Sequence, residues 1–220
     1  MRALVIGASG GIGAALAVAL SSQRYDVTSL SRSVDGFDLT DEASIAHHLG
    51  ALRGGFDRVF IATGALELNG AAPEKSLRQL DPATLAAQFA LNATGPALVL
   101  KHLLPLIPRE TPAKIAVLSA RVGSIGDNGL GGWYAYRAAK AALNQLVHTA
   151  AIELARSHKQ AVLACLHPGT VATPLTAKYA GNHPTVPPAE AAENLMTVLD
   201  SLTPAQTGGF FDWQGKVVPW

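Results

Sequence analysis

Short apolar runs alternate along the chain with longer segments in which apolar residues recur at helical spacing. Six short runs have the length of strands: 2–6, 27–30, 58–62, 114–118, 161–166 and 209–212. The first, 2–6, is rich enough in branched residues to be a buried parallel strand. The helical segments predicted between them are 14–20, about 40–52, about 82–104, a stretch through Tyr136 to Ser157 without glycine or proline, and 189–202. This alternation predicts an α/β fold built on a parallel sheet.

Composition limits the classes of protein that fit this pattern. The chain has 220 residues, 49% of them hydrophobic and 15% charged, which suits one globular domain over 1–220. A net charge of +1 without a long basic run argues against nucleic acid or an anionic membrane as the main partner. Cys165 is the only cysteine, so no intrachain disulfide can form and we expect a cytoplasmic protein with a buried, inert thiol.

A glycine-rich turn separates the first strand from the first helix. It reads Gly-Ala-Ser-Gly-Gly-Ile-Gly over 7–13 and interrupts the uncharged stretch 3–23, so we reject a signal peptide or membrane span there. Such glycines let the backbone turn tightly beside a pyrophosphate, while the helix N-terminus offers free N–H groups. Ser9 adds a hydroxyl to this predicted phosphate site. A plain tight turn is the alternative.

The second strand ends at Ser31-Arg32-Ser33, where many dinucleotide-binding folds carry an acid for the ribose 2′-hydroxyl. Arg32 can hold a 2′-phosphate that a carboxylate would repel, which favours NADP and leaves NAD as the second choice. A solvated surface arginine is the alternative. The next helix is missing or tiny, and Asp38 either accepts from an adenine amino group or caps the helix that follows.

Three later turns also lie at the carboxyl ends of predicted strands. Thr63-Gly64 has the small residues that let a cofactor ribose approach the backbone. The turn Pro168-Gly169 would place the backbone and Thr173 near the nicotinamide end. Residues 174–188 are rich in Pro, Gly and polar groups, which predicts a mobile substrate lid. No His, Cys, Asp and Glu residues have metal-ligand spacing, so we predict no metal site.

Two pairs of residues four apart suggest proton chemistry. Tyr136 and Lys140 share one helix face, and a nearby ammonium is expected to lower the phenol pKa from its usual value of about 10, giving a proton donor for a carbonyl. A surface Tyr stacked on a Lys stem is the alternative. Asn92 precedes Pro96, which removes an N–H, so we expect a kink whose free carbonyl holds a water for a proton relay. A kink needed only for packing is the alternative.

Together these motifs resemble the short-chain dehydrogenase/reductase family over essentially the whole chain. The glycine turn, Asn92, Tyr136-x-x-x-Lys140 and Pro168-Gly169 follow in the family's order. The run 121–137 and the ending Phe-Asp-Trp-Gln-Gly-Lys-Val-Val-Pro-Trp resemble its C-factor and small carbonyl-reductase branch. The resemblance implies a Rossmann-type, doubly wound parallel sheet with helices on both faces, and an NADP(H)-dependent oxidoreductase.

The resemblance also implies roles for single residues. Tyr136 would be the acid-base residue, Lys140 would lower its pKa and hold the nicotinamide ribose, and Asn92 would anchor a relay water. The implied cofactor contacts are Gly7, Ser9, Gly11, Ile12 and Gly13 for the pyrophosphate, Arg32 for the 2′-phosphate, Asp38 and Leu39 for adenine, Ala62, Thr63 and Gly64 for the ribose, and Pro168, Gly169, Val171 and Thr173 for the nicotinamide end.

Two departures from the family pattern bear on activity. The family's Asn-Asn-Ala-Gly after the strand is Ile61-Ala62-Thr63-Gly64 here, which removes small polar contacts. Ala120 takes the position of the usual catalytic serine, and Ser119 lies one residue earlier, on the opposite side of an extended segment unless the backbone shifts. Ser124 is an outside candidate. By analogy with an oxyanion donor, losing the serine is expected to cost about 10²–10³ in rate.

Two hypotheses therefore follow. The first is an NADPH-dependent carbonyl reductase or alcohol dehydrogenase acting on a small molecule, which the Tyr136–Lys140 pair favours. The second is a cofactor-binding redox sensor or signalling partner with little turnover, which Ala120 favours. Trp133, Tyr134 and Tyr179 suggest an apolar or aromatic carbonyl substrate. The family often pairs through the helices that hold Asn92 and Tyr136, so a homodimer or homotetramer is expected.

Overall fold

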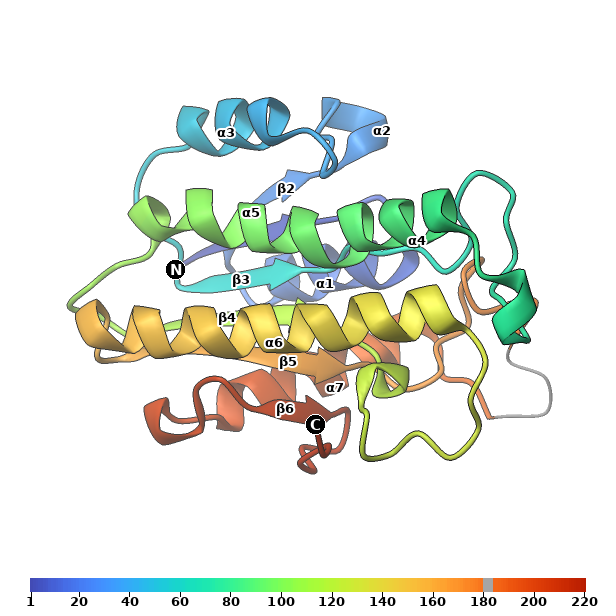
Figure 1. Cartoon of the computed structure of the whole chain (residues 1–220). Coiled ribbons are helices and arrows are strands. Elements are labelled where there is room, and N and C mark those ends of the chain that lie inside the picture. Colours follow the sequence, from blue (N-terminus) through green and yellow to red (C-terminus); the bar gives the residue numbers. More distant parts are fainter. Residues whose placement is uncertain (180–183) are drawn as a thin grey trace.

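A six-stranded, fully parallel sheet forms the centre of the computed structural model, which describes residues 1–179 and 184–220 (Figure 1). The strand order is β2-β1-β3-β4-β5-β6. The strands are β1 (Arg2–Ile6), β2 (Asp26–Leu30), β3 (Arg58–Ile61), β4 (Ala113–Leu118), β5 (Ala161–His167) and β6 (Phe210–Asp212). All six predicted strands are confirmed within one or two residues at each end.

Helices cover both faces of this sheet (Figure 1). One face carries α1 (Gly11–Ser22) and α7 (Pro188–Ser201), which pack against each other. The other carries α3 (Glu42–Ala51), α4 (Pro82–Phe89), α5 (Gly95–Leu103) and α6 (Tyr134–Ser157). The expected tiny helix after β2 is α2 (Arg32–Asp35). The predicted Rossmann-type, doubly wound fold in a single domain is confirmed.

Alternating side chains of the buried strands supply two separate cores. In β4, Ile115 and Val117 belong to the core beneath α3, α5 and α6, whereas Ala116 and Leu118 belong to the core beneath α1 and α7. Period-two alternation on a strand buried on both faces explains why the sequence run is continuously apolar. Cys165 lies in the first core with no exposed surface, and burial raises its thiol pKa to about 12, as expected of an inert thiol.

The long helix that holds Asn92 is interrupted by a π-helical turn, Ala90–Thr94, just before Pro96. The Gly95 N–H donates to the Ala90 carbonyl, five residues earlier. The irregularity expected at Pro96 is thus accommodated by a wider turn that keeps α4 and α5 in one run. By length and composition the whole run Pro82–Leu106 is apolar enough to cross a membrane. The core helix of a soluble protein passes the same test, and α5 buries residues in the first core.

The chain winds outward in both directions from β1, because β1 pairs with β2 on one side and with β3 on the other. The turns after β1 and β3 therefore leave the same edge of the sheet side by side. In open parallel sheets, ligands bind in the crevice at such a reversal of winding. The turns after β4 and β5 follow along the same edge, and most of the predicted site residues lie on these four turns and on α6. Arg32, Asp38 and Leu39 follow β2 instead, and Asn92 lies in the π-helical turn.

Candidate active site

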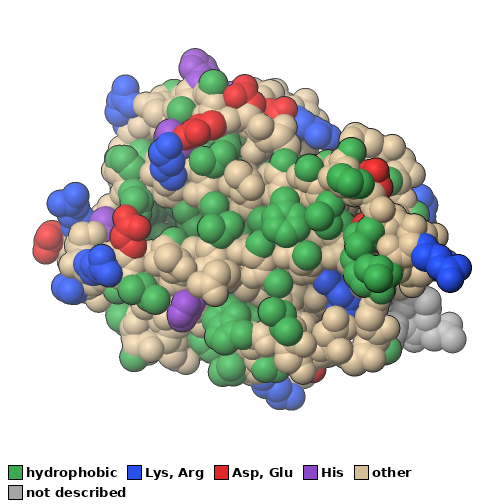
Figure 2. Space-filling view, in the orientation of Figure 1, with side chains coloured by type: hydrophobic (Ala, Val, Ile, Leu, Met, Phe, Trp, Pro, Cys, Tyr) green, Lys and Arg blue, Asp and Glu red, His purple; other side chains and the backbone are tan. Residues whose placement is uncertain are grey.

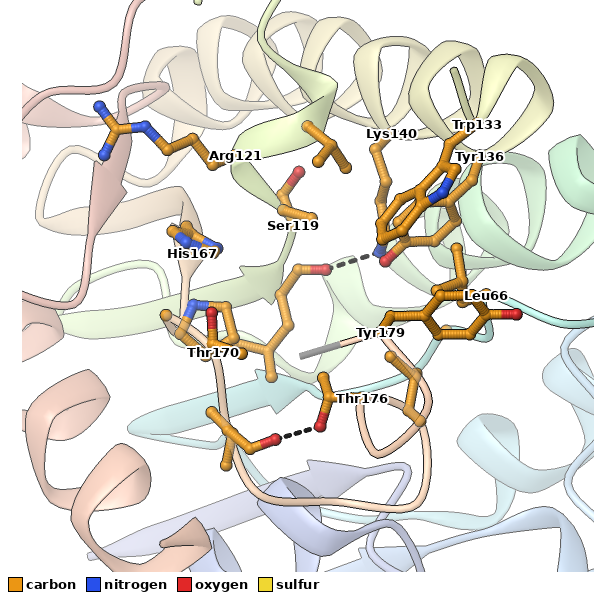
Figure 3. A pocket seen from close by; sticks show the side chains of 18 of the residues that line it. Leu66, Ser119, Arg121, Trp133, Tyr136, Lys140, His167, Thr170, Thr176 and Tyr179 are labelled. Atoms are coloured by element: carbon orange, nitrogen blue, oxygen red, sulfur yellow. Dashed lines mark hydrogen bonds between the residues drawn. The ribbon is translucent and has the colours of Figure 1, made fainter. Parts of the chain in front are cut away.

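A cavity of about 650 Å³ lies at this carboxyl edge (Figure 3). It brings together most of the predicted catalytic and cofactor residues. The ones that line it are Ile12, Ala62, Thr63, Gly64, Ser119, Tyr136, Lys140, Pro168, Gly169, Val171 and Thr173. The cavity reaches from the glycine-rich turn to the first turns of α6, so it can hold a long ligand that spans both. Gly7, Ser9, Gly11, Gly13, Arg32, Asp38, Leu39 and Asn92 lie outside its wall.

The glycine-rich turn has the properties of a phosphate cradle. The N-cap of α1 is Gly10, which has no side chain to occupy the first N–H groups, and no acid lies in the first turn. A Cβ on Gly13 would lie 2.2 Å from the Gly7 carbonyl oxygen, so only glycine lets the helix start this close to the turn. Free N–H groups and the positive end of the helix dipole favour an anion here. These residues fit the pyrophosphate of a dinucleotide.

The residues predicted to bind the adenosine half of the cofactor differ in how accessible they are. Arg32 begins α2 and is exposed, so its guanidinium is free to meet a phosphate. Asp38 accepts two hydrogen bonds from Thr40, which lower its pKa, and Asp41, not Asp38, caps α3. The capping alternative for Asp38 is therefore wrong. Leu39 is buried in the first core, so only its backbone remains for adenine.

Asn92 is completely buried, and its side chain fixes the turn after β3. Its Oδ1 accepts from the Ala65 N–H at 3.1 Å, and its Nδ2 donates to the Ala65 carbonyl at 2.9 Å and to Gln88 Oε1 at 2.6 Å. A Cβ on Gly64 would lie 2.9 Å from Asn92 Oδ1 and 3.3 Å from Lys140 Nζ. Asn92 and Lys140 thus meet across Gly64. The water relay through the Asn92 carbonyl stays a prediction.

Tyr136 and Lys140 are both buried on the inner face of α6, which contradicts the surface-pair alternative. Lys140 Nζ lies 5.9 Å from the Tyr136 ring centroid and donates to the Leu118 carbonyl at 3.0 Å (Figure 3). The expected lowering of the phenol pKa is not found. Burial raises the pKa of Tyr136 to about 12 and lowers the pKa of Lys140 to about 8, because a low-dielectric site disfavours both charged forms.

Two serines near Ala120 could supply the hydroxyl that this position lacks. Ser119 lines the cavity, but its hydroxyl donates to Asn144 Oδ1 on α6 at 2.6 Å, so its proton is not directed at a substrate. Ala120 has an extended backbone and lines the same cavity, but it carries no hydroxyl. The Ser124 hydroxyl donates to the Pro219 carbonyl and accepts from the Asp127 N–H. Ser124 therefore holds the C-terminal segment, and the prediction that it could replace the catalytic serine was wrong.

The segment predicted as a lid begins against the cavity. Thr173 lies beside the glycine turn, since a Cβ on Gly11 would come within 2.8 Å of its Cγ2. Further along this segment, Lys178 and Tyr179 contact the carboxylate of Glu67. The Tyr179 ring packs edge-on against Trp133, with 5.4 Å between the ring centroids. Within the predicted lid 174–188, residues 180–183 lie outside the described residues, and its mobility stays a prediction.

Several lining residues were missed by sequence reasoning. His167 ends β5 immediately before Pro168, and burial with the nearby Arg121 charge lowers its pKa to about 4, so it is neutral at pH 7. Arg121 and Arg137 also line the cavity, as does the expected Trp133, whereas Tyr134 does not. Their positions in the sequence could have indicated them, because His167 comes at the end of a predicted strand and Arg137 directly follows Tyr136. Within the described residues, no group of three His, Cys, Asp or Glu could hold a metal ion.

Comparison with known proteins agrees with this geometry. A family model described as enoyl-(acyl carrier protein) reductase matches residues 13–207. The C-signal of Myxococcus xanthus is 37% identical over 145 residues, covering 66% of this chain and 84% of that protein. The 1-hydroxy-2-glutathionyl-2-methyl-3-butene dehydrogenase of Rhodococcus sp. (strain AD45) is 33% identical over 188 residues, covering 84% and 79%.

Among solved structures, the NADPH-bound carbonyl reductase from chicken fatty liver superposes with a TM-score of 0.81 at 22% identity, covering 100% of this chain and 98% of that one. This likeness concerns the fold. The sheet, the glycine turn and the buried Tyr–Lys pair define a Rossmann-fold oxidoreductase. The family match over most of the chain makes the assignment narrower: the chain belongs to the short-chain dehydrogenase/reductase family.

Proposed function

We propose that the protein is an NADPH-dependent carbonyl reductase in which Tyr136 is the proton donor. The observation that carries this proposal is the position of Tyr136 and Lys140. Both side chains are buried in the wall of one cavity that extends to the glycine-rich turn. A hydroxyl on one face and a phosphate cradle at the other end suit a nicotinamide cofactor with a small carbonyl substrate beside it.

NADPH, when bound, supplies the hydride that reduces the carbonyl carbon. Tyr136 donates its phenolic proton to the carbonyl oxygen, which gives the alcohol and leaves a phenolate. Lys140 stabilises that phenolate, because an ammonium within 5.9 Å of the ring favours the charged form. Asn92 positions Lys140 indirectly by fixing the turn around Gly64. The apolar surround of Leu66, Val122 and Trp133 excludes water and suits an apolar or aromatic carbonyl.

The first test is NADPH consumption with a panel of aromatic aldehydes, diketones and quinones. We expect turnover by the wild type, and a loss of at least about 10²-fold in kcat for Tyr136→Phe, because the general acid is removed. Tyr134→Phe is the matched control, since Tyr134 is on the same helix but does not line the cavity. Full activity of Tyr136→Phe would contradict the assignment of the proton donor.

The preference for NADP over NAD rests on Arg32. We expect Arg32→Ala to weaken NADPH binding about tenfold and to change NADH binding little, because the guanidinium can pair with the 2′-phosphate that NADH lacks. Calorimetric titration of both cofactors measures this, with Arg156→Ala at the far end of α6 as control. Equal effects on both cofactors would refute the 2′-phosphate role and leave NAD as an equal choice.

A second candidate is a cofactor-binding protein that acts as a redox sensor or signalling partner. Ala120 supports it, because the wall lacks a serine hydroxyl at that position. The similarity to a protein named C-signal also favours it. If the protein binds NADPH but turns over no substrate of the panel, this candidate gains weight. Restored turnover in Ala120→Ser would then identify Ala120 as the cause. A cytoplasmic location, inferred from cysteine usage, is part of either proposal.

A further inference from the structure

The wall of the cavity carries a marked imbalance of charge. Among the described residues that line it, Arg121, Arg137 and Lys140 are cationic and none is acidic. A buried or half-buried positive charge is costly unless a counter-charge or hydrogen-bond acceptors compensate it. The three cations differ in the partners that the protein itself provides for them.

Two of them have another role. Lys140 is buried beside the Tyr136 ring, and its ammonium donates to the Leu118 carbonyl. Arg121 lies on the other side of the cavity from Tyr136 and Trp133 (Figure 3). Its guanidinium contacts Asp127 at 2.5 Å, and Asp212 lies 3.8 Å away. Arg121 is thus paired with carboxylates, and the charge of Lys140 lies at the hydroxyl-bearing residue Tyr136.

Arg137 differs from Arg121, because no carboxylate of the described residues lies within 4.0 Å of its guanidinium, and from Lys140, because it is half-buried and not buried. Its Nε donates to the Gly132 carbonyl at 3.0 Å and its Nη1 to the Val122 carbonyl at 3.3 Å. A guanidinium has five N–H bonds. Two are used in these contacts, and three have no partner among the described residues. The side chain is half-buried, so its charge is screened less than at an open surface.

The position of Arg137 relates it to the reacting group. It directly follows Tyr136 on α6, and it lines the cavity together with Val122 and Gly131. A substrate with its carbonyl at the Tyr136 hydroxyl can therefore extend a second group toward the guanidinium. The planar fork of an arginine matches a carboxylate or phosphate, and the apolar neighbours Leu130 and Trp133 strengthen such a pair.

We propose that Arg137 binds an anionic group, in the simplest case a carboxylate, on the carbonyl substrate. This inference rests on the proposed reductase function and names its substrate class: aromatic or apolar carbonyl compounds with an acidic group at the far end. The two backbone contacts of Arg137 hold the guanidinium in place and at the same time fasten the loop before α6. The substrate pocket is thus selective through charge as well as through shape.

The test uses a matched pair of aldehydes, 4-carboxybenzaldehyde and its methyl ester, with NADPH. We expect the wild type to have a lower KM for the carboxylate. Arg137→Met keeps the apolar stem and removes the charge, so it should raise the KM of the carboxylate about tenfold and that of the ester less than about twofold. Arg137→Lys should recover part of the difference, because the charge returns without the fork. Arg121→Met is the control, and the ratio of the two KM values should not change.

A binding measurement makes the proposal independent of turnover. Quenching of tryptophan fluorescence by 4-carboxybenzyl alcohol and by its methyl ester, in the presence of NADP, reports affinity alone. Tighter binding of the acid that is lost in Arg137→Met supports the anion site even when neither aldehyde is reduced, in which case only the reductase function fails. Equal binding of acid and ester by the wild type, or equal losses for both in Arg137→Met, would overturn the proposal and leave Arg137 as a loop clamp.

Discussion

The ammonium of Lys140 is the most costly single group in the cavity wall. It is only 3% exposed and, among the residues that the structure describes, its one hydrogen-bond partner is the Leu118 carbonyl. Burial lowers its pKa to about 8, from 10.5 in an exposed lysine. The folded chain therefore binds fewer protons than the unfolded chain between these pH values, so this group makes the free energy of unfolding rise with pH there. Below pH 8 the folded protein therefore contains an unfavourable buried ammonium, at the position where it can stabilise the Tyr136 phenolate.

Lys140→Met is accordingly expected to inactivate the protein while stabilising it. The shift corresponds to about 3 kcal/mol, and losing the hydrogen bond to Leu118 offsets about 1 kcal/mol, so we expect a net gain of about 2 kcal/mol at pH 7. Urea unfolding at pH 7 and pH 9.5 measures it. The gain should shrink at the higher pH, where the wild-type lysine is largely neutral in the folded state. A variant less stable than the wild type at pH 7 would show that the buried charge costs little.

Single residues were also where sequence reasoning was least complete. The four-residue spacing of Tyr136 and Lys140 was enough to place both on one helix face, and the structure confirms it. The predicted direction of the Tyr136 pKa shift was wrong, because the spacing of two residues does not reveal that both are desolvated. The Ser119 bond to Asn144 joins a strand end to a helix, and such a contact between distant segments leaves no local pattern.

At the scale of elements, the junction of β1 and α1 depends on close backbone contact. Gly13, in the first turn of α1, lies against the Gly7 carbonyl with no room for a methyl group. The turn before α6 depends on a different device: the Trp133 backbone is left-handed, and the Ala135 N–H is capped by Glu74 from a distant loop. The β1–α1 junction thus depends on a glycine without a side chain, whereas the start of α6 depends on the Glu74 carboxylate.

Gly13→Ala is expected to damage both the fold and the cofactor site. Its Cβ would come within 2.2 Å of the Gly7 oxygen, so the turn must shift away from its phosphate-binding form. We expect NADPH affinity to fall at least about tenfold and stability to fall by about 1–3 kcal/mol. Calorimetry and thermal unfolding measure these. Gly50→Ala on α3 is the control, because open space surrounds Gly50 and alanine favours a helix by about 1 kcal/mol.

Elements of regular pattern were the most predictable part of the molecule. Most of the strands were found because they are short apolar runs, and the glycine turn marked the β1–α1 junction. The π-helical turn at Ala90–Thr94 was only partly foreseen, since Pro96 indicates a lost hydrogen bond but not how neighbouring groups pair again. Glu74 as a cap for α6 was not foreseen, because it lies about 60 residues earlier in the chain.

At the scale of the whole molecule, the face formed by α4, α5 and α6 carries hydrophobic side chains among few charges (Figure 2). On α6, Leu146 and Ile152 are 40% and 51% exposed. Exposed apolar side chains gathered on one face are typical of a subunit interface. We therefore propose that two copies pair through this face, as was expected from the helices that hold Asn92 and Tyr136.

Light scattering after size exclusion tests this assembly. We expect a mass of twice 22.8 kDa, or a further doubling, for the wild type. Ile152→Glu should shift the mass toward one chain, because a charge would be buried in the interface. Val34→Glu on α2 is the control, since Val34 is exposed on a different element. A wild type that elutes as a single chain at micromolar concentration would refute the pairing.

The complete burial of Cys165 has a practical consequence. Because the only thiol of the chain lies in the core with a pKa near 12, thiol-reactive dyes have no native target on the folded protein. A cysteine introduced at an exposed position, such as Ala177 in the turn that follows Thr173, would carry the label alone. Fluorescence from that site could then follow movement beside the cavity in the otherwise unaltered chain, without a cysteine-free background having to be made first.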